Sequence, residues 1–584
     1  MSEHENTPTG VGGGEDGTVK EETFTPSVAD SERSSKDHGG TSGSEDPEIA
    51  EILSRSATVF QVPTQTKAVW HEALARRADE MVHRNEKKGT TALAPVPAGR
   101  VVQSIAPMEW LGDHMMVYIP ESGHWAPSQY LLEQVLTEFV PTLKPTFGLP
   151  QAKQILDHAG TLTTSFILKD QPNRAEIDAR TWDAEPVITF QNGQLHVPTM
   201  TLQPAGPAAH TTWHIPFDWD PTATSAKLDQ FLASAVPDAI SRRNLLAFIG
   251  YSFARYDTSQ HQFMYLLGSG RNGKSLLLKL ITRALGPYWS NTNLKKLVDS
   301  RFAASSLVFS VLNLVGDQDA IYLASTELLK ELSGFDAIDV ERKFRDSFPY
   351  IAKTKFLFAV NELPRTADIS YGFFRRPLIV EFPQRFPQDP DYERALLSDD
   401  QVVQALLVQA IDAYQAMVAH KGFWIEGKAG ELLNRYRSEN DLVFAAVDDG
   451  LLQADPNPKH HIAPWALPPL VNLYGSEREN QKLSQAEILK RLNHAGIIVT
   501  KHREPSGHRE WYYTGISADP DQAIALIHRS AVTNPDGTET VNVGGKRYFA
   551  MALLAAWGIT DPHGTIHDPE IAHAFHEEGG STRL

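Results

Sequence analysis

A glycine-rich segment with the pattern G-x-x-x-x-G-K-S could hold phosphate groups. It reads GSGRNGKS, follows the apolar run Phe263–Leu267 and precedes a leucine-rich run that stops at Gly286. Glycines let backbone N–H groups turn towards phosphate oxygens, and a helix start adds partial positive charge. In this setting the lysine reaches the β- and γ-phosphates and the serine hydroxyl binds Mg²⁺. The segment predicts a site for ATP and Mg²⁺ formed by Gly268, Ser269, Gly270, Arg271, Asn272, Gly273, Lys274 and Ser275.

Acidic side chains follow a second apolar run. Gly-Asp-Gln-Asp comes directly after Val311–Val315. A carboxylate at the end of a strand beside the phosphate loop can hold Mg²⁺, and a second one can polarise the attacking water. The pattern favours Asp317 for the first role and Asp319 for the second. Because Gly-Asp also favours turns, a plain strand-ending turn is the alternative.

Polar residues lie beside two further predicted strands. Asn361 follows the apolar run Lys355–Val360, where an amide could orient the attacking water or contact the γ-phosphate. Arg375 and Arg376 precede the apolar run Leu378–Phe382. A guanidinium that reaches a neighbouring subunit's γ-phosphate would stabilise the charge that develops during hydrolysis. The alternatives are a turn asparagine and a solvated arginine pair.

These side chains need a parallel sheet to bring them together. Residues 263–383 alternate strand and helix patterns, which predicts an α/β fold with helices flanking that sheet. Before it, Asn192-Gly193 between two strand-like runs predicts a hairpin with a type I′ turn. After it, residues 484–516 run helix, strand, turn, strand, the order of a winged helix. The chain has no cysteine, which excludes disulfides, Fe–S clusters and thiolate zinc sites.

Composition and patterning divide the chain into segments. Residues 1–48 are rich in Gly, Ser, Thr and Glu and cannot bury enough apolar surface to fold. The expected organisation is a disordered acidic tail over 1–48, a helical segment and linker over 49–99, an α+β domain over 100–225, the phosphate-loop domain over 226–390, a helical segment over 391–450, a winged-helix-like domain over 451–530, and a C-terminal region with an acidic tail over 531–584.

Net charge at first argues against a nucleic-acid partner. The chain has 54 basic and 72 acidic residues, a net charge of −18. Residues 1–48 hold 12 acids and 3 bases, and residues 559–584 hold 5 acids and 1 base, which leaves −5 for the rest. Residues 263–386 hold 17 bases and 12 acids. This local positive excess suits phosphate binding. No apolar run reaches the roughly 18 residues of a membrane helix, so no membrane partner is expected.

The order and spacing of these motifs resemble a known family. The pieces GSGRNGKS, LNLVGDQD, ELLKELSGFDAIDVERKF, FLFAVNELP and FFRRPLIVEF resemble the motor of superfamily 3 helicases, in the phage and plasmid primase-helicase group that includes the poxvirus primase-helicase. The resemblance covers residues 100–390. It implies an AAA+-like P-loop motor that assembles as a hexameric ring and uses ATP to move along single-stranded DNA, typically from 3′ to 5′.

The resemblance also implies a role for each motif residue. Family members often carry two adjacent acids in the second motif, whereas Gln318 separates them here, so the identity of the second acid stays open. The implied assignments are Walker A for Lys274 and Ser275, Walker B for Asp317 and Asp319, the sensor for Asn361, and the arginine finger that acts in trans for Arg375 or Arg376.

A further segment combines cations with an aromatic ring. Residues 341–344 match the family's DNA-contacting hairpin in the central channel, which implies Arg342, Lys343 and Phe344 as DNA-binding residues. Cations follow phosphates, and a ring stacks on bases without reading sequence. A solvated surface hairpin is the alternative.

We therefore expect an ATP-driven replicative DNA helicase of a virus, phage, plasmid or integrated element, acting in the host cytoplasm. The expected partners are single-stranded and forked DNA and further copies of the chain. The residues before 100 are too few for a primase domain, so a separate primase is expected. The alternatives are an AAA+-type remodelling or packaging ATPase and a non-motor P-loop phosphotransferase.

Two weaker patterns lie near the C-terminus. Basic residues in the winged-helix-like segment are compatible with origin DNA binding, or with a domain that only packs subunits; they are Lys490, Arg491, Lys501, His502, Arg503 and Arg509. Four histidines crowd the last residues and favour a polar tail over a metal site; they are His563, His567, His573 and His576.

Overall fold

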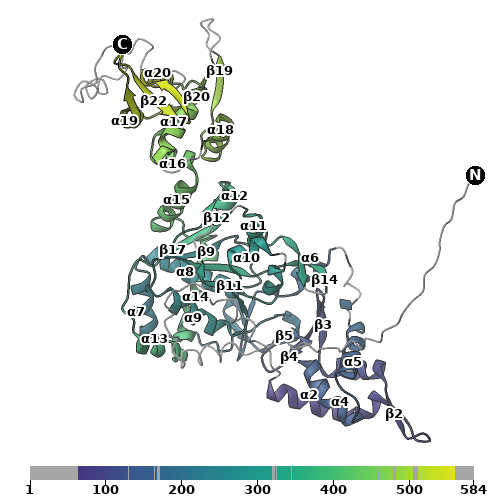
Figure 1. Cartoon of the computed structure of the whole chain (residues 1–584). Coiled ribbons are helices and arrows are strands. Elements are labelled where there is room, and N and C mark those ends of the chain that lie inside the picture. Colours follow the sequence, from purple (N-terminus) through teal and green to yellow (C-terminus); the bar gives the residue numbers. More distant parts are fainter. Residues whose placement is uncertain are drawn as a thin grey trace, which may run out of the picture. The chain divides into compact units, whose positions relative to one another are not determined.

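The computed structural model of the chain describes residues 63–559, except 129–130, 164, 167–170, 172, 301, 319–321, 324, 343–344, 458–459, 478–481 and 504–510. The side chains of residues 298, 299, 342, 345 and 477 are likewise not described. The tails predicted over 1–48 and after 559, with their four C-terminal histidines, lie outside the described residues. Figure 1 shows the elements with the labels used below.

A five-stranded parallel sheet confirms the predicted α/β fold. Every residue of its central strand β15 is buried, as expected where both faces of a sheet are covered. The spatial order is β10-β11-β15-β9-β17, and all neighbouring strands are parallel. The strands are β9 (Phe263–Leu267), β10 (Trp289–Ser290), β11 (Leu312–Gln318), β15 (Lys355–Val360) and β17 (Pro377–Glu381).

The two faces of this sheet belong to two separate cores. On β9, Met264 and Leu266 lie in one core and Phe263 and Tyr265 in the other, because successive side chains of a strand point to opposite faces. The first core includes α7 (Ala226–Ala235), α8 (Ala239–Phe253), α9 (Lys274–Leu285), α13 (Pro390–Leu397) and α14 (Asp400–His420). The second includes α10 (Leu294–Asp299), α11 (Glu327–Gly334), α12 (Tyr371–Phe374), α15 (Lys428–Asn440) and the short helix η7 (Ala303–Leu307).

Helices α8 and α14 approach each other at a glycine. A Cβ on Gly250 would lie 2.0 Å from the backbone oxygen of Ala410, so only glycine fits there. Since α13, α14 and α15 pack in the sheet cores, the helical segment predicted over 391–450 mostly belongs to the sheet domain. Among the described residues, α14 alone is long and apolar enough to cross a membrane, and half of its apolar window is buried. Its packing in the core accounts for that composition.

The N-terminal part of the described chain has its own core. The predicted linker is wrong: β1 and β2 pair as a hairpin, and α3 has proline in its first turn, where a missing N–H costs nothing. The boundary at 99/100 therefore runs through α3. The elements are α2 (Thr64–Arg76), η2 (Ala78–Met81), β1 (Val82–Asn85), β2 (Thr90–Leu93), α3 (Pro95–Ile105), β3 (Met108–Leu111), β4 (His114–Ile119), β5 (His124–Pro127), α4 (Leu132–Leu143) and α5 (Leu149–Thr161).

A second antiparallel sheet contains the predicted hairpin. It consists of β6 (Val187–Phe190), β7 (Gly193–His196) and β8 (Thr201–Gln203), followed by η6 (Pro207–Ala209) and with η5 (Val197–Thr199) before β8. The structure confirms the hairpin, but its turn lies one residue earlier than predicted. Gly193 pairs with Phe190, so the two residues of the turn are Gln191 and Asn192. A Cβ on Gly193 would lie 2.5 Å from the backbone oxygen of Gln203, so the neighbouring strand requires this glycine.

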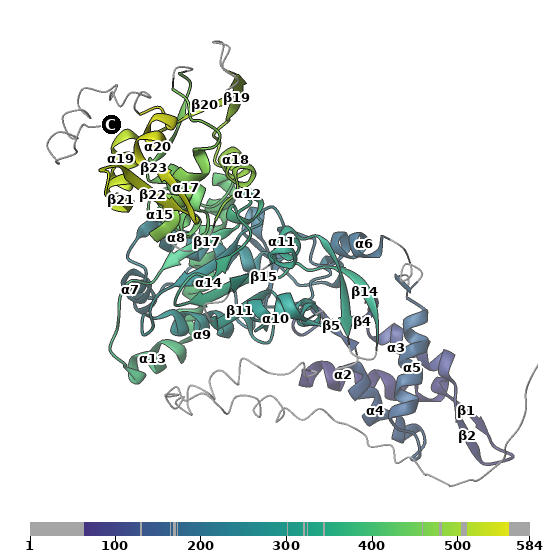
Figure 2. The ribbon, with the colours of Figure 1, turned by 45° about the horizontal axis from the view of Figure 1, so that its top comes forward.

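Strands β13 (Ala337–Arg342) and β14 (Arg345–Ile351) form a hairpin between α11 and β15. Strand β14 lies beside α6 (Arg174–Thr181), as Figure 2 shows. Where β14 leads into β15, the Lys353 ammonium donates to the carbonyls of Ala179, Trp182 and Asp183 at 2.7, 2.9 and 2.9 Å. A cation there satisfies acceptors at the end of α6. Burial lowers the pKa of Lys353 to about 8.

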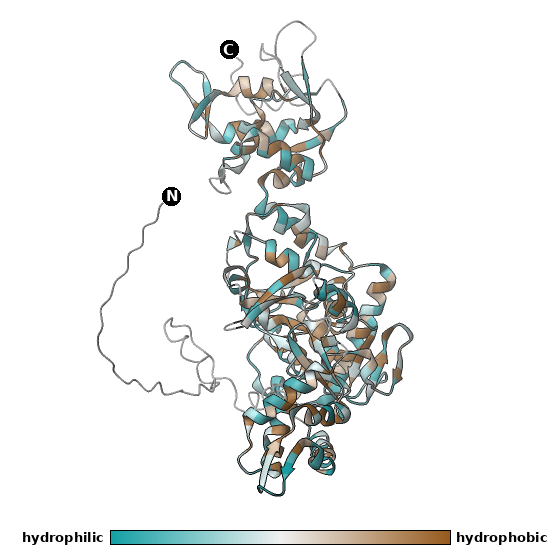
Figure 3. Ribbon diagram, turned by 90° about the vertical axis from the view of Figure 1, so that its right-hand side faces the viewer, coloured by the Kyte–Doolittle hydropathy of each residue, from teal (hydrophilic) through white to brown (hydrophobic). Residues whose placement is uncertain are grey.

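The C-terminal domain begins at α16 and has a fourth, separate core. Figure 3 shows hydrophobic stretches, in brown, on its helices near the C label. The boundaries predicted at 451 and 530/531 are displaced, because residues of α16 and of the elements after 530 share this core. Its elements are α16 (Leu442–Asp448), β18 (Leu452–Asp455), α17 (Leu467–Tyr474), η8 (Gly475–Glu477), α18 (Gln485–His494), β19 (Thr500–Arg503), β20 (Trp511–Ala518), α19 (Pro520–Ser530), β21 (Ala531–Thr533), β22 (Glu539–Val543), β23 (Lys546–Phe549) and α20 (Ala550–Ala556).

Candidate nucleotide site

The glycine-rich loop lies between β9 and α9, at the carboxyl end of the parallel sheet. Its backbone has positive φ at Gly270 (92°), Arg271 (51°) and Gly273 (90°). Helix α9 begins immediately afterwards, at Lys274, so its first N–H groups are free of intrahelical partners beside the loop. The partial positive charge of a helix start makes such a place suitable for an anion.

Side-chain packing fixes the start of this loop. A Cβ on Gly268 would lie 2.0 Å from Nδ2 of Asn272 and 2.7 Å from the backbone oxygen of Phe382. Asn272 is buried and donates a hydrogen bond to the same Phe382 oxygen at 3.2 Å. The loop is therefore tied to the end of β17, and Gly268 leaves room for that tie.

Lys274 lies at the meeting point of two strand ends. Its side chain is only 6% exposed, and its ammonium donates to the carbonyl of Gly268 and, at 3.5 Å, to Oδ1 of Asn361. Burial lowers the pKa of Lys274, and the negative charge of Asp317 partly opposes that shift. The structure thus brings Lys274, Asn361 and Asp317 close together, as the sequence predicts from the phosphate loop and two separate strand ends.

The end of β11 separates a solvent-facing acid from a buried amide. Asp317 is exposed. Gln318 is 3% exposed, and its Oε1 accepts a hydrogen bond at 2.9 Å from the N–H of Leu294, the first residue of α10. A glutamine in place of a second adjacent acid therefore has a structural role. Asp319 lies outside the described residues, and Ser275 is exposed in the first turn of α9.

The two adjacent arginines have different surroundings. Arg375 is exposed. Arg376 is 8% exposed, and its guanidinium donates to Oγ of Ser333 at 3.0 Å and to the carbonyl of Gly372 at 2.8 Å. Burial lowers the pKa of Arg376, and the charge of Arg375 adds to that effect. Of the two guanidinium groups, that of Arg375 faces solvent and that of Arg376 is held within the sheet domain.

The predicted DNA-binding residues are not described: Lys343 and Phe344 lie outside the described residues, as does the Arg342 side chain. The strands on either side of them are antiparallel and paired up to Arg342 and Arg345. The backbone thus has the hairpin form that the resemblance implies, and the contacts at its tip stay a prediction.

Asp368 is a residue that the sequence did not single out. Burial raises its pKa, but hydrogen bonds from Lys330, Ser370 and Thr326 outweigh burial and lower it to about 2. The ammonium of Lys330, in α11, lies 2.8 Å from the carboxylate of Asp368. Ser370 is the N-cap of α12, the helix that precedes Arg375. Asp368 thus holds the arginine segment against α11. No local pattern could have found it, because its partners come from separate elements.

The basic residues that the sequence singles out in the C-terminal domain differ in their surroundings. Arg491 lies 3.5 Å from the buried carboxylate of Asp441, so it has a partner within the domain. On the exposed strand β19, Lys501 lies 4.8 Å from the ring centre of Trp511, a side chain that is 49% exposed. Arg509 lies outside the described residues.

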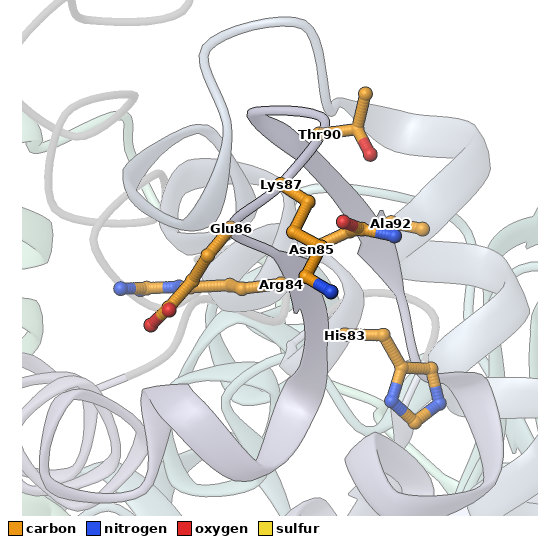
Figure 4. Close-up of a pocket in the computed structure, with 7 residues that line it drawn as sticks. All are labelled: His83, Arg84, Asn85, Glu86, Lys87, Thr90 and Ala92. Atoms are coloured by element: carbon orange, nitrogen blue, oxygen red, sulfur yellow. The ribbon is translucent and has the colours of Figure 1, made fainter.

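A separate pocket lies in the N-terminal hairpin. Figure 4 shows its lining side chains, which come from β1, β2 and the turn between them and include Arg84, Glu86 and Lys87. Its mixed charges offer no obvious metal or phosphate cradle. Across the described part of the chain, no group of three or more His, Asp or Glu side chains could hold a metal ion unaided.

Known proteins resemble the two regions that precede and contain this site. A family model described as D5 N terminal like matches residues 106–237, and one described as a family of unknown function (DUF5906) matches residues 266–376. A protein of Acanthamoeba polyphaga mimivirus named "Putative helicase L207/L206" is 25% identical over 170 residues, which are 28% of this chain and 18% of that protein. The chain resembles primase-helicases. The expected resemblance is thereby confirmed, although the chain spans less than a fifth of the length of this curated relative.

Solved structures of the NrS-1 C-terminal region are also similar. An apo A form covers 52% of this chain and 76% of its own, with a TM-score of 0.35 and 11% identity. A second A-form structure, of residues 305–718, covers 72% of this chain and 99% of its own, with a TM-score of 0.36 and 10% identity. Scores this low carry no argument about function.

Proposed function

We propose that the chain is an ATP-driven DNA helicase that works as a ring of identical subunits. The observation that carries this proposal is the position of Lys274, buried between the carbonyl of Gly268 and the amide of Asn361 where α9 begins. An ammonium held by neutral oxygens can exchange them for phosphate oxygens. The helicase-like relatives and the basic excess around the sheet support DNA as the substrate of the motor.

The nucleotide would lie along the glycine-rich loop. Its phosphates would accept hydrogen bonds from the loop and from the first turn of α9, with Lys274 beside the β- and γ-phosphates. Ser275 and Asp317 are the residues that would hold Mg²⁺, which neutralises charge on the phosphates during transfer. Asn361 is close enough to Lys274 to orient the attacking water, and we assign Asp319 to its activation.

Arg375 is the residue that we assign as the finger for a neighbouring subunit. It is exposed and follows α12, whereas Arg376 is held inside its own subunit. A guanidinium supplied in trans stabilises the charge of the transition state and makes hydrolysis depend on assembly. The proposed ring therefore has one composite site at each subunit contact.

The C-terminal domain supports a second DNA contact. Its elements from α16 to β20 run helix, strand, helix, helix, strand, strand, with the sheet order β18-β20-β19. This is the order of a winged helix, and its exposed strand β19 carries Lys501, His502 and Arg503. We assign duplex DNA, such as an origin, to this surface.

Two measurements on the full chain test the proposal. ATP hydrolysis is measured with and without single-stranded DNA, and strand displacement is measured on a forked duplex. We expect DNA to stimulate hydrolysis and ATP to drive unwinding. Failure of both would leave a remodelling ATPase or a phosphotransferase as the better account.

Lys274→Ala should abolish hydrolysis, because it removes the cation beside the phosphates. The matched control is Lys279→Ala on the same helix, which pairs instead with Glu393 at 2.8 Å. It should retain hydrolysis. Equal activity in the two variants would contradict the assignment of the phosphate loop.

A further inference from the structure

The turn Ser333–Asp336 occupies a junction between three parts of the sheet domain. It ends α11 and leads directly into β13, the first strand of the hairpin. Phe335 has a left-handed backbone conformation with φ 58°, which a non-glycine residue adopts only when its surroundings hold it. The contacts of this turn on two sides explain what holds it.

The first contact connects the turn with the arginine segment. Arg376 donates from Nη1 to Oγ of Ser333 at 3.0 Å and from Nε to the carbonyl of Gly372, the second residue of α12. Asp336 lies near enough to favour the charged form of Arg376 electrostatically. Figure 2 shows α11 and α12 side by side. Arg376 thus links the root of the hairpin to the backbone that carries Arg375.

The second contact connects the turn with the central strand. The Lys355 ammonium lies 5.3 Å from the ring centre of Phe335 and 4.6 Å from that of Tyr251, distances at which a cation is attracted to a ring. It also donates to the carbonyl of Asp257 at 2.9 Å. Lys355 is the first residue of β15, and Asn361 directly follows the last.

We propose that the turn Ser333–Asp336 couples the hairpin β13–β14 to the nucleotide site, through Arg376 on one side and Lys355 on the other. This inference rests on the proposed function. A displacement at the root of the hairpin is passed through Arg376 to Arg375, and along the buried strand β15 to Asn361. Ser333 and Phe335 are positioning residues, since they act on the site only through these partners.

The test separates basal hydrolysis from its response to DNA. Ser333→Ala removes the acceptor of Arg376, and Phe335→Leu removes the ring over Lys355 while keeping an apolar side chain. We expect each variant to hydrolyse ATP without DNA at a rate within about twofold of wild type, and to lose at least about fivefold of the stimulation by single-stranded DNA. Base pairs unwound per ATP should fall with it. Phe335→Tyr keeps the ring and should retain stimulation.

Three outcomes decide the matter. Wild-type stimulation in both Ser333→Ala and Phe335→Leu, with equal melting temperatures, would overturn the coupling. Loss of DNA-free hydrolysis as complete as in Arg375→Ala would also overturn it, because the turn would then belong to the catalytic arrangement. If the wild-type chain hydrolyses ATP without any response to DNA, the proposed function itself fails, a result distinct from the other two.

Discussion

Adjacent arginines show how far a single residue's role depends on distant contacts. Arg375 and Arg376 are equivalent in the sequence, and either could be the finger. The structure separates them through Ser333, which is 43 residues away and accepts a hydrogen bond from Arg376. Sequence reasoning could find the pair from its place before a strand, but could not rank its members.

Two stacked histidines, a buried His124 and a partly buried His214, give a prediction at the same scale. The rings of His124 and His214 stack at 4.5 Å, and Nδ1 of His214 lies 3.2 Å from the hydroxyl of Tyr288. Burial lowers the pKa of His214 to about 4. Because the unfolded chain takes up this proton near pH 6.5 and the folded chain does not, the contribution to stability is intact above pH 6.5 and is lost as the pH falls towards 4.

We expect His214→Gln to reduce the fall in melting temperature between pH 6.5 and 4. The effect corresponds to at most about 3 kcal/mol, from the size of the pKa shift. Melting temperatures measured at half-unit steps give the comparison, with His83→Gln on the exposed strand β1 as the control. An unchanged pH profile for His214→Gln would exclude this histidine as a source of acid sensitivity.

At the scale of elements, one close helix contact carries a prediction. Because a Cβ on Gly250 would collide with backbone of α14, Gly250→Ala must push α8 and α14 apart. We expect a loss of about 2 to 4 kcal/mol of unfolding free energy, measured by denaturant unfolding. Gly206→Ala is the control, because no atom lies within 4 Å of its added Cβ. Similar stability of both variants would contradict the tight crossing.

Elements with strong local patterns could be predicted, and others could not. The phosphate loop and the strands β9, β11, β15 and β17 follow from apolar runs with polar ends. The β1–β2 hairpin and α3 could not be predicted, because Gly89 and the prolines of this segment are typical of a linker. Pro95 is in fact the first residue of a helix. The sequence predicts the Asn192-Gly193 hairpin but places its turn one residue too late. Gly193 is needed for close contact with the neighbouring strand β8 and not for the turn, and that contact cannot be seen in the local sequence.

At the scale of the whole molecule, the proposed trans action of Arg375 predicts that two inactive variants complement each other. Arg375→Ala keeps an intact phosphate loop, and Lys274→Ala keeps an intact finger. Mixed in equal amounts and allowed to exchange subunits, they should regain roughly a quarter of wild-type hydrolysis, since one contact in four combines both intact parts. ATPase measurements over a series of mixing ratios test this, and a mixture as inactive as its components would contradict the trans assignment.

Lys353 sets a limit on where the chain can be divided. The residue is 5% exposed, and the three oxygen partners of its ammonium belong to residues 179–183, far ahead of the phosphate loop. A shortened chain that starts at α7 would keep the ammonium and lose every one of those oxygens, leaving a cation without partners against apolar surface. The region before the sheet is thus part of the support of the sheet domain, and we expect a stable fragment to begin upstream of α6.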